Sequence, residues 1–568
     1  MDTSQQLRTK LRSIDHRGYP AYKDLRGSYG FGDYILNIEH VQGDPFAAPS
    51  RLSVRVPAKT AGFPEELLAG AHRRVAIEDL VLRCFGAQTV KFSHKAHGSG
   101  KSGLIGVSRP GQEIMARSAC EMEEKSNALI IRFAVGFPAN GRTINAGELE
   151  KVLFDFLPEC VLRGCLFKNI GEKKVMDRIC LADDVNCIRQ ELKKRSLVAF
   201  VADGALLARK SGASDLPMEG CIPFASPDSL RVEMELPHAG KVTGMGIPRG
   251  ITLIVGGGYH GKSTLLKAIE RGVYDHIRGD GREFVITDDK AMKIRAEDGR
   301  AITGVDVSMF INNLPGGRDT TFFSTENASG STSQAANLVE AAQAGSDVLL
   351  IDEDTCATNF MVRDALMERV VAREKEPITP FMERAGYLYD VMGISTVLVA
   401  GSSGAYFHIA HNIIQMDEYV PVDITQKAKE AAKADPDSAP DVPEAPSGVS
   451  KPRIPKVNTA IRREERVKTK SFGTDTISID RTEVDIRYLE QLVDQEQAAA
   501  LSLMLLKLEK EIFDDKKSVS ECVKTLTDIF EEKGFSGISP GSYIAQDLAY
   551  VRPAEIAAMI NRYRALRL

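Results

Sequence analysis

The residues best suited to chemistry lie in one segment, ITLIVGGGYHGKSTLLKAI, at positions 251–269. It contains the pattern G-x-x-x-x-G-K-S, with Gly256, Gly261, Lys262 and Ser263 in register. Glycines let a loop wrap so that backbone N–H groups and a helix N-terminus face phosphate oxygens. The lysine then neutralises phosphate charge, and the serine hydroxyl is a ligand for Mg²⁺. The segment therefore predicts a phosphate-binding loop for ATP and Mg²⁺ rather than an ordinary glycine-rich turn.

A second segment, DVLLIDED at positions 347–354, completes the predicted site. Its four apolar residues form a buried strand, and the C-terminal end of that strand brings acids beside the phosphate loop. Asp352 is expected to hold Mg²⁺ through water, with Ser263 as a direct ligand. Glu353 is placed to orient or deprotonate the attacking water, so Glu353 and Lys262 are the expected catalytic residues. The alternative is a strand end that carries acids as caps only.

Backbone N–H groups make most of the phosphate contacts in such a loop, so the whole loop is expected to bind the nucleotide. The expected contacts are Gly256, Gly257, Gly258, Tyr259, His260, Gly261, Lys262, Ser263 and Thr264.

Apolar strands and helical stretches alternate around this site, between residues 226 and 420. The strands read ITLIV, FVIT, DVLLID and STVLVA. Such alternation is typical of a parallel sheet with crossover helices. We therefore expect an α/β core at 226–420 that positions the phosphate loop.

The region before this core, residues 1–225, mixes short β-rich runs with Gly-rich and Pro-rich loops, which predicts an α+β domain. Its β-rich runs are 52–56, 128–135 and 197–202. After the core, residues 421–475 begin with a stretch rich in Ala, Pro, Asp and Lys, which is typical of a flexible linker.

Residues 476–568 show apolar positions at spacings of three and four, which indicates amphipathic helices. Ser518 and Glu521 form a capping box, Gly534 suits a helix C-terminus, and Pro553 suits the first turn of a last helix. The sequence therefore predicts a C-terminal helical domain.

Composition excludes several classes of protein. The 568 residues are 43% hydrophobic and carry a net charge of −5, which rules out a disordered chain and a uniformly basic surface. No run of about 18 uncharged apolar residues occurs, and the N-terminus has no apolar signal region, so we expect a cytoplasmic protein with no membrane partner. The nine scattered cysteines favour buried thiols over disulfides or a zinc site.

Beyond the phosphate loop, the chain resembles the ATP-binding-cassette (ABC) ATPases. ASGSTSQ, positions 328–334, is similar to their signature motif, and its Ser329 lies 23 residues before Asp352. EDTCATN, positions 353–359, looks like their segment after the acidic strand. The resemblance implies that Ser329, Gly330 and Ser331 bind the γ-phosphate held by a second subunit. Nucleotide would then close a homodimer.

Three departures from the ABC pattern affect the catalytic expectations. Ser331 and Thr332 replace two signature residues, and Gly401 stands where a switch histidine is expected, so Ser402, Ser403 or His408 would have to substitute. No Phe, Tyr or Trp lies between residues 227 and 258, where a ring would stack on adenine. The sequence therefore supports the predictions of phosphate and Mg²⁺ binding with more residues than the predictions of adenine binding and of water positioning.

Across nearly its whole length, except the linker, the chain resembles a stand-alone bacterial family of predicted ATPases of the ABC class. The phrases that carry the resemblance are HVQGDPFAAPSR, GSGKSGLIGVSRPGQE, FVADGALLARKSGASDLP, VGGGYHGKSTLL, KIRAEDGR and VDVSMFINNLP. It implies a homodimer whose ATPase core is flanked by its own N- and C-terminal domains, with RNA as a partner.

A nucleic-acid partner would need basic surface, and two segments offer it. Residues 451–470 hold eight Lys or Arg against two Glu, and the loop HGSGKSG carries Lys101. For the Lys101 loop the alternative is a plain flexible loop. The main hypothesis is a Mg²⁺-dependent ATPase whose homodimer closure acts on single-stranded RNA or another nucleic acid. Its alternative is a nucleotide-gated nucleic-acid clamp with little or no hydrolysis.

Overall fold

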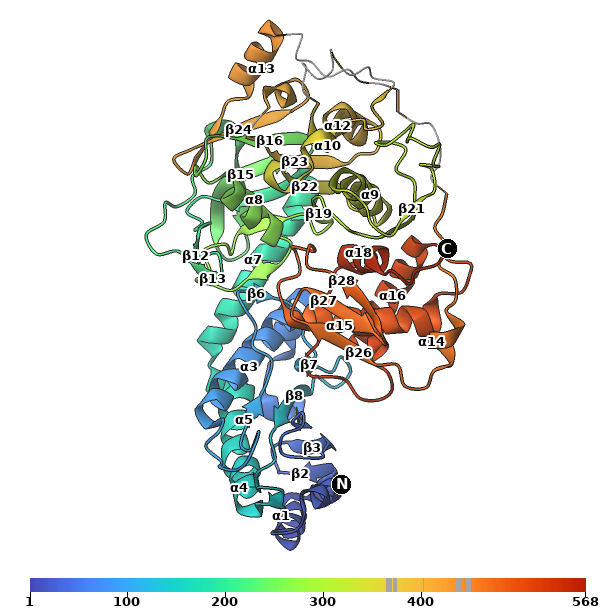
Figure 1. The fold of residues 1–568 in the computed structure, drawn as a ribbon. Coiled ribbons are helices and arrows are strands. Elements are labelled where there is room, and N and C mark those ends of the chain that lie inside the picture. The colour runs from blue at the N-terminus through green and yellow to red at the C-terminus, as the bar shows by residue number, and fades with distance from the viewer. Residues whose placement is uncertain (364–369, 371–374, 402, 436–441, 443, 446–450) are drawn as a thin grey trace. The chain divides into compact units, whose positions relative to one another are not determined.

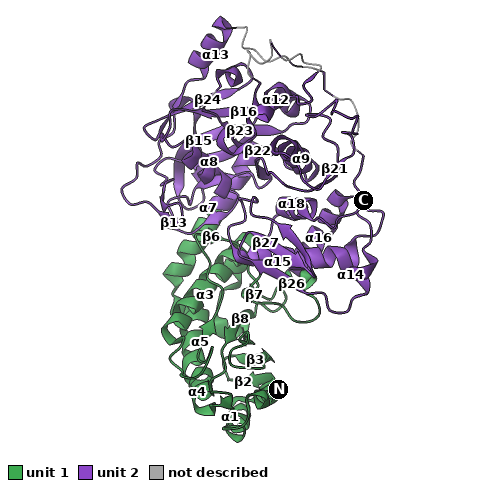
Figure 2. Ribbon diagram, viewed as in Figure 1, with its two compact units in different colours: residues 1–183, 535–550 green, residues 184–534, 551–568 purple. Residues whose placement is uncertain are grey.

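Two compact units make up the protein in its computed structural model (Figure 2). The structure describes the whole chain except residues 364–369, 371–374, 402, 436–441, 443 and 446–450. The first unit comprises residues 1–183 and 535–550, and the second comprises 184–534 and 551–568. The first unit therefore ends before the expected boundary at residue 225, and it includes a short segment from the C-terminal region.

A seven-stranded sheet forms the centre of the first unit, in the order β1-β2-β3-β4-β8-β5 with β7 also paired to β8. Leu52, Val54 and Val56 are buried on one face of this sheet, as the alternation in β4 predicts. Helices α3 and α5 pack against each other, and their apolar residues join the same core. The strands are β1 (Asp2–Thr3), β2 (Gly27–Gly30), β3 (Ile35–His40), β4 (Ser50–Val56), β5 (Ile105–Gly106), β7 (Cys120–Met122) and β8 (Leu129–Val135). The main helices are α1 (Ser4–Ser13), α3 (Ala71–Phe92), α4 (Ala146–Lys151), α5 (Leu157–Cys165) and the start of α7 (Glu172–Lys194).

The second unit contains a six-stranded sheet in the order β19-β22-β23-β16-β24-β25 (Figure 1). Its first five strands are parallel, and β25 is antiparallel to β24. This confirms the expected parallel sheet. The strands are β16 (Ile251–Val255), β19 (Ala291–Ile294), β22 (Val348–Asp352), β23 (Ser395–Val399), β24 (Asn412–Asp417) and β25 (Val420–Asp423).

One predicted strand lies elsewhere. FVIT supplies β18 (Val285–Thr287), which pairs antiparallel with β11 (Leu197–Ala202) instead of joining the parallel sheet. Together with β14 (Arg231–Leu236) and β15 (Gly240–Pro248) these strands form a four-stranded antiparallel sheet. Helix α8 (Lys262–Arg271) contacts both sheets, so both hold the helix that follows the phosphate loop. Pairing of β11 with β15 and β18 explains why residues 184–225 belong to the second unit.

The C-terminal part of the second unit combines helices with a small sheet that the sequence analysis did not predict. Strands β26 (Thr469–Phe472), β27 (Thr476–Ile479) and β28 (Thr482–Asp485) pair antiparallel, and β26 and β27 contact α15 (Gln495–Lys507). The capping box opens α16 (Val519–Lys533), Gly534 ends it, and Pro553 opens α18 (Pro553–Arg562), as predicted. Within the expected linker, residues 425–434 form helix α13 (Thr425–Ala434), so at least this part has regular structure.

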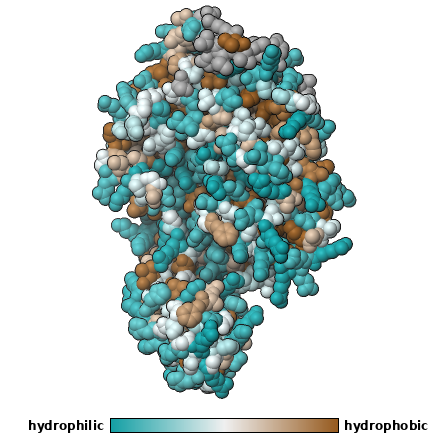
Figure 3. Space-filling model, viewed as in Figure 1, coloured by the Kyte–Doolittle hydropathy of each residue, from teal (hydrophilic) through white to brown (hydrophobic). Residues whose placement is uncertain are grey.

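The surface in Figure 3 is mostly hydrophilic, with hydrophobic residues scattered in small groups. Among the described residues, no helix combines the length and apolar character that crossing a membrane requires.

Candidate functional site

The predicted phosphate loop lies between strand β16 and helix α8, as its sequence context requires. Gly256 has φ +142°, and a Cβ there would lie 2.4 Å from the carbonyl oxygen of Met416. Gly261 has φ +94° and caps the N-terminus of α8, while Ser263 and Thr264 occupy the first helical turn. Glycine is therefore required at both ends of the loop, because a side chain would strain the backbone or collide with β24.

Lys262 lies over the phosphate loop. Its Nζ donates hydrogen bonds of 2.7 and 2.8 Å to the carbonyl oxygens of Gly256 and Gly257. Ionised phosphate oxygens are stronger acceptors than these carbonyls. The ammonium group is thus already positioned within the loop that would receive phosphate.

Two larger side chains of the loop, Tyr259 and His260, have separate surroundings. Tyr259 is 98% exposed and has φ +64°, a left-handed backbone that is uncommon outside glycine. His260 Nδ1 accepts a hydrogen bond of 2.9 Å from the backbone N–H of Glu418 and lies 3.4 Å from Asp417. His260 therefore ties the phosphate loop to the turn between β24 and β25, a contact that sequence analysis did not anticipate.

Asp352 is aligned with the phosphate-loop strand through the strand between them. Asp352 pairs with Val399 of β23, and Val399 pairs with Ile254 of β16, so the three residues form one row across the sheet. Asp352 is 7% exposed, and its Oδ1 has no hydrogen-bond partner among the described residues. A buried carboxylate oxygen without a partner costs free energy unless a ligand satisfies it.

These donors fit a magnesium ion. Mg²⁺ keeps several of its waters and takes few protein oxygens, so the partly exposed Ser263 hydroxyl and the Asp352 carboxylate are a suitable set. The described residues contain no group of three or more His, Cys, Asp or Glu that could hold a metal by themselves.

Glu353 is held by the main chain of the neighbouring strand end. Its Oε2 accepts a hydrogen bond of 2.7 Å from the backbone N–H of Gly401, which directly follows β23 and Ala400. Gly401 is the position where the ABC resemblance predicts a switch histidine. A backbone amide therefore contacts the predicted catalytic carboxylate where the class would place an imidazole. Of the expected substitutes, Ser402 lies outside the described residues, and Ser403 instead caps the short helix that contains His408.

The signature-like residues lie at the start of helix α9 (Gly330–Gln343). Ser329 is the N-cap residue, and its Oγ lies 3.0 Å from Thr332 Oγ1 and 3.4 Å from Ser331 Oγ. Among the described residues, no hydrogen bond joins these hydroxyls to the phosphate loop of the same chain. The helix N-terminus supplies backbone N–H groups and a partial positive charge, as anion binding requires.

Sequence analysis did not single out Gln334, which connects α9 to the segment after β22. Its Oε1 accepts a hydrogen bond of 2.9 Å from the backbone N–H of Ala357, and the side chain is fully buried. The signal was present in the sequence, because Gln334 ends the signature-like run ASGSTSQ. The buried amide fixes the residues after Glu353 relative to the start of α9.

Most basic residues of the predicted segment 451–470 are exposed, and so is Lys101 of the other predicted segment. In the run 451–470, Arg453 is 5% exposed and bonds Gln343 of α9, so it belongs to the interior rather than to a binding surface. In the other segment Lys101 is exposed, but the loop is tightly packed. A Cβ at Gly103 would lie 2.0 Å from the carbonyl oxygen of Ala96. Close backbone packing therefore explains why residue 103 is a glycine.

A basic pocket that sequence analysis missed lies on the polar face of the sheet in the first unit. Ser28, Asn37, Ser53 and Arg132 form one row across β2, β3, β4 and β8. Beside this row is a pocket of about 600 Å³. Its lining includes Arg26, His40, Arg51, Arg132, Glu39 and Tyr543. These residues come from distant parts of the sequence, so no local charge run indicated them.

Comparison with known protein families identifies the class. The model of the ABC-ATPase P-loop domain matches residues 171–453, and that of the N-terminal domain of ATPases of the ABC class matches 4–168. A third model, the MRB1590 C-terminal domain, matches residues 468–568. The chain therefore belongs to the ABC-class ATPase family that carries its own N- and C-terminal domains. Membership of this family supports ATP binding.

An individual protein that is similar in sequence matches only part of this chain. The "Uncharacterized protein MJ1628" of Methanocaldococcus jannaschii is 36% identical over 194 residues, or 32% of this chain and 42% of that protein. The chain thus spans about two fifths of the length of that relative.

Two solved structures are similar to part of the chain. One is cbiO1 from Clostridium perfringens, part of the ABC transporter complex cbiONQ, with 16% identity, a TM-score of 0.26 and coverage of 42% of this chain and 92% of that one. The other is MJ1267 in its ADP conformation, an ATP-binding cassette of an ABC transporter, with 10% identity, a TM-score of 0.26 and coverage of 42% and 95%.

Proposed function

We propose that the protein is a Mg²⁺-dependent ATPase whose nucleotide-driven homodimer closure is coupled to nucleic-acid binding. The observation that carries the proposal is the arrangement of Asp352 and Glu353. Asp352 lies in one row with the phosphate-loop strand and has a buried oxygen without a partner, and Glu353 is oriented by the Gly401 amide. Hydrolysis requires both a metal-ligating acid and a positioned carboxylate, and the two are adjacent at one strand end.

The reaction would be in-line attack of water on the γ-phosphate. Lys262 and the loop N–H groups would bind the β- and γ-phosphates, and the Glu353 carboxylate would accept a proton from the attacking water. Mg²⁺, held by Ser263 and by Asp352 through water, would neutralise charge on the phosphate oxygens. The Gly401 amide donates to Oε2 of Glu353. A charge-assisted bond of this kind fixes the orientation of the carboxylate.

A second copy of the chain would complete the site. Ser329 and the N-terminus of α9 supply groups that can bind an anion. Among the described residues, no hydrogen bond joins the hydroxyls of Ser329, Ser331 and Thr332 to the phosphate loop of the same chain. In the ABC class such groups act on nucleotide held by the other subunit. Dimer closure on ATP is therefore the arrangement that uses them.

One observation favours the alternative, a nucleotide-gated clamp with little or no hydrolysis. Gly401 offers a fixed N–H and no side chain, so at this position nothing can rotate to shuttle a proton. Turnover would then depend on Glu353 and Mg²⁺ alone, and the ATP-bound dimer would persist.

The basic pocket of the first unit supports the nucleic-acid part of the proposal. Arg26, Arg51 and Lys23 surround His40 closely enough that burial and these charges lower the pKa of His40. Arg51 stacks on the ring of Tyr543 at 4.9 Å, whereas Arg132 is buried, donates to the carbonyl oxygen of Ser118 and pairs with Glu121. The two exposed arginines, Arg26 and Arg51, suit the phosphates of a single strand.

Steady-state ATP hydrolysis tests the proposal. Wild type and Glu353→Gln are compared with and without single-stranded RNA, at two salt concentrations. We expect turnover that rises with RNA, more at low salt, and that falls at least about a hundredfold in Glu353→Gln, because a positioned base contributes on this scale. Tight ATP binding with negligible wild-type turnover would favour the clamp. Turnover that RNA does not change would contradict the coupling to nucleic acid.

A further inference from the structure

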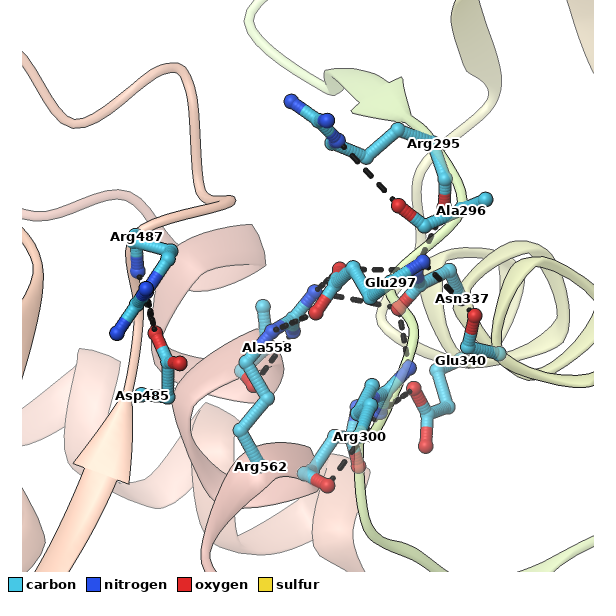
Figure 4. Close-up of polar contacts among 12 residues, drawn as sticks. Arg295, Ala296, Glu297, Arg300, Asn337, Glu340, Asp485, Arg487, Ala558 and Arg562 are labelled. Carbon is cyan, nitrogen blue, oxygen red and sulfur yellow. Dashed lines mark hydrogen bonds and ion pairs between the residues drawn. The ribbon is translucent and has the colours of Figure 1, made fainter. Parts of the chain in front are cut away.

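A buried polar network joins helix α9 to the C-terminal helix α18 within the second unit (Figure 4). We call it the Glu297 network, and its members are Glu297, Arg300, Asn337, Glu340 and Arg562. All five side chains lie almost entirely out of contact with solvent. Because ions inside a protein are costly unless their partners are complete, the network must be maintained as a unit.

Glu297 is the centre of the network. Its carboxylate accepts bonds from both Nε and Nη2 of Arg562, at 3.1 Å for Nε, and from Asn337 Nδ2 at 2.9 Å. Burial alone would raise the pKa of Glu297, but the charges of Arg562 and Arg300 outweigh it, so the pKa is lowered and the group stays ionised. Removing Arg562 would leave a buried carboxylate with only part of its charge compensated.

The turn that carries Glu297 brackets the signature-like residues on both sides. On one side, Gly299 donates to the carbonyl oxygen of Ala328 at 2.8 Å, and Ala328 donates to that of Arg300 at 2.9 Å. On the other side, the backbone N–H of Glu297 donates to Ser333 Oγ at 2.8 Å. Ser329 lies between these two attachments, so its position depends on the Glu297 turn.

The C-terminal helix holds that turn from the opposite side. Arg562 is the last residue of α18 and also donates to the Ala558 carbonyl within its own helix at 2.8 Å. Arg564, two residues later, donates to the carbonyl oxygens of Glu326 at 2.9 Å and Gly299 at 3.1 Å. Arg300 in turn donates to the carbonyl oxygen of Asn561 at 3.3 Å. Bonds thus run in both directions between the turn and the end of α18.

Small side chains line much of the seam between α9 and α18. It contains a cavity of about 10 Å³, close to the size of one water, lined largely by alanines. Oε1 of Glu340 lies 3.7 Å from Nη1 of Arg453 in a buried ion pair. Within the described part of the chain, Oδ1 of Asn561 has no hydrogen-bond partner. The alanines at the cavity are Ala341, Ala344, Ala554, Ala557 and Ala558.

We infer that Arg562 is a positioning residue for Ser329: through Glu297 it couples the C-terminal helix to the nucleotide-sensing end of α9. The inference rests on the proposed function, because Ser329 must bind γ-phosphate for the coupling to affect turnover. A shift of α18 would then change the placement of Ser329, and closure of the dimer on ATP would shift α18.

The same helix offers a matched control. Arg552, at the other end of α18, pairs with Glu555 at 3.0 Å, and the two side chains are 4% and 3% exposed. The Arg562 and Glu297 side chains are each 5% exposed. Arg552 also donates to the carbonyl oxygens of Asp289 and Ala291, which lie outside α9. Arg552→Ala therefore removes a comparable buried pair from the same helix without touching the Ser329 segment.

The first test compares ATP binding and turnover in Arg562→Ala, Arg562→Lys and Arg552→Ala. We expect Arg562→Ala to lower kcat by about tenfold and to weaken ATP-dependent dimerisation, with ATP affinity of the isolated subunit unchanged. Arg562→Lys keeps the charge but loses the two-pronged bond, so it should recover part of kcat. Arg552→Ala should lower the melting temperature by a similar amount and keep kcat. Equal kcat losses in Arg562→Ala and Arg552→Ala would overturn the inference.

The second test needs no catalysis and separates this inference from the proposed function. Amide hydrogen exchange of residues 328–334 is measured without nucleotide in the same variants. We expect exchange to accelerate at least about tenfold in Arg562→Ala and to stay as in wild type in Arg552→Ala. Unchanged exchange in Arg562→Ala overturns the inference even if the protein is an active ATPase. Accelerated exchange in a protein that neither hydrolyses ATP nor dimerises supports the positioning and rejects the proposed function instead.

Discussion

The Oε2 atom of Glu353 lies 2.7 Å from the backbone nitrogen of Gly401 and accepts its hydrogen bond. The two residues follow adjacent parallel strands, β22 and β23, so the sheet itself sets their separation. A main-chain donor cannot rotate away, and it orients the carboxylate without an additional side chain. The orientation of the predicted catalytic carboxylate therefore depends on where β23 ends.

Replacing Gly401 tests that dependence. Gly401→Pro removes the N–H, so Glu353 loses its orienting bond, and we expect kcat to fall by about tenfold to a hundredfold with ATP affinity retained. Gly401→Ala keeps the N–H and adds a methyl group that meets no atom within 4 Å, so it should hydrolyse ATP like wild type. Single-turnover hydrolysis measures both. Equal activity of the two variants would show that the bond does not matter.

Asp352 should control the response to Mg²⁺. In Asp352→Asn the buried oxygen that lacks a partner loses its charge, so we expect Mg²⁺ to strengthen ATP binding at least about tenfold less than in wild type. Asp354→Asn is the control, because Asp354 is exposed and two positions further along. Calorimetric titration with ATP in Mg²⁺ and in a chelator gives the comparison. A full Mg²⁺ effect in Asp352→Asn would remove Asp352 from the metal site.

Arg51 should contribute to nucleic-acid affinity through charge. Arg51→Ala is expected to weaken binding of single-stranded RNA by about fivefold to tenfold at low salt. The slope of log affinity against log salt concentration should become shallower by the amount that corresponds to about one phosphate contact. Arg163→Ala, in helix α5, removes the same charge from an exposed residue that is paired with Glu159. Fluorescence anisotropy with labelled RNA at several salt concentrations measures both variants. An equal loss of RNA affinity in Arg163→Ala would indicate that the net charge of the protein, rather than the pocket, determines binding.

The stability of the protein should depend on pH through Glu78. Its carboxyl group accepts the Met122 N–H at 2.8 Å, and burial raises its pKa from 4.5 to about 8. The folded state therefore keeps this proton between about pH 4.5 and 8 while the unfolded chain releases it. Glu78 thus contributes stability below pH 4.5 that is lost as pH rises towards 8.

Thermal unfolding of wild type and Glu78→Gln at pH 5, 7 and 9 tests this linkage. The neutral amide keeps an acceptor for Met122 and does not ionise. We expect the melting temperature of wild type to fall relative to Glu78→Gln as pH rises, by an amount that corresponds to a few kcal/mol. A constant difference across the three pH values would mean that the carboxyl ionises alike in both states.

Local sequence predicted the elements whose signals are short-range. The phosphate loop between β16 and α8, the capping box at Ser518 and the helix start at Pro553 all lie where predicted. Each depends on residues within a few positions of one another, through backbone geometry or a helix cap. Such signals remain readable without knowledge of the rest of the chain.

The pairing of strands that lie far apart in the sequence could not be predicted in the same way. FVIT has the composition of a buried strand, but composition does not say which sheet it joins, and it pairs with β11 instead of the parallel sheet. The strands β26 to β28 are four residues each, too short for their alternation to stand out among helical signals.

The sequence by itself determined the chemistry that a phosphate loop and an acidic strand end can perform, because those residue types and spacings have few other uses. Tertiary structure decided which groups surround that chemistry. It buried Arg453 although it lies in a basic run, brought Tyr543 to the pocket of Arg51, and joined Glu297 to Arg562 across 265 positions. The physical reason is that burial and ion pairing depend on distances in space, which periodicity and local charge do not encode.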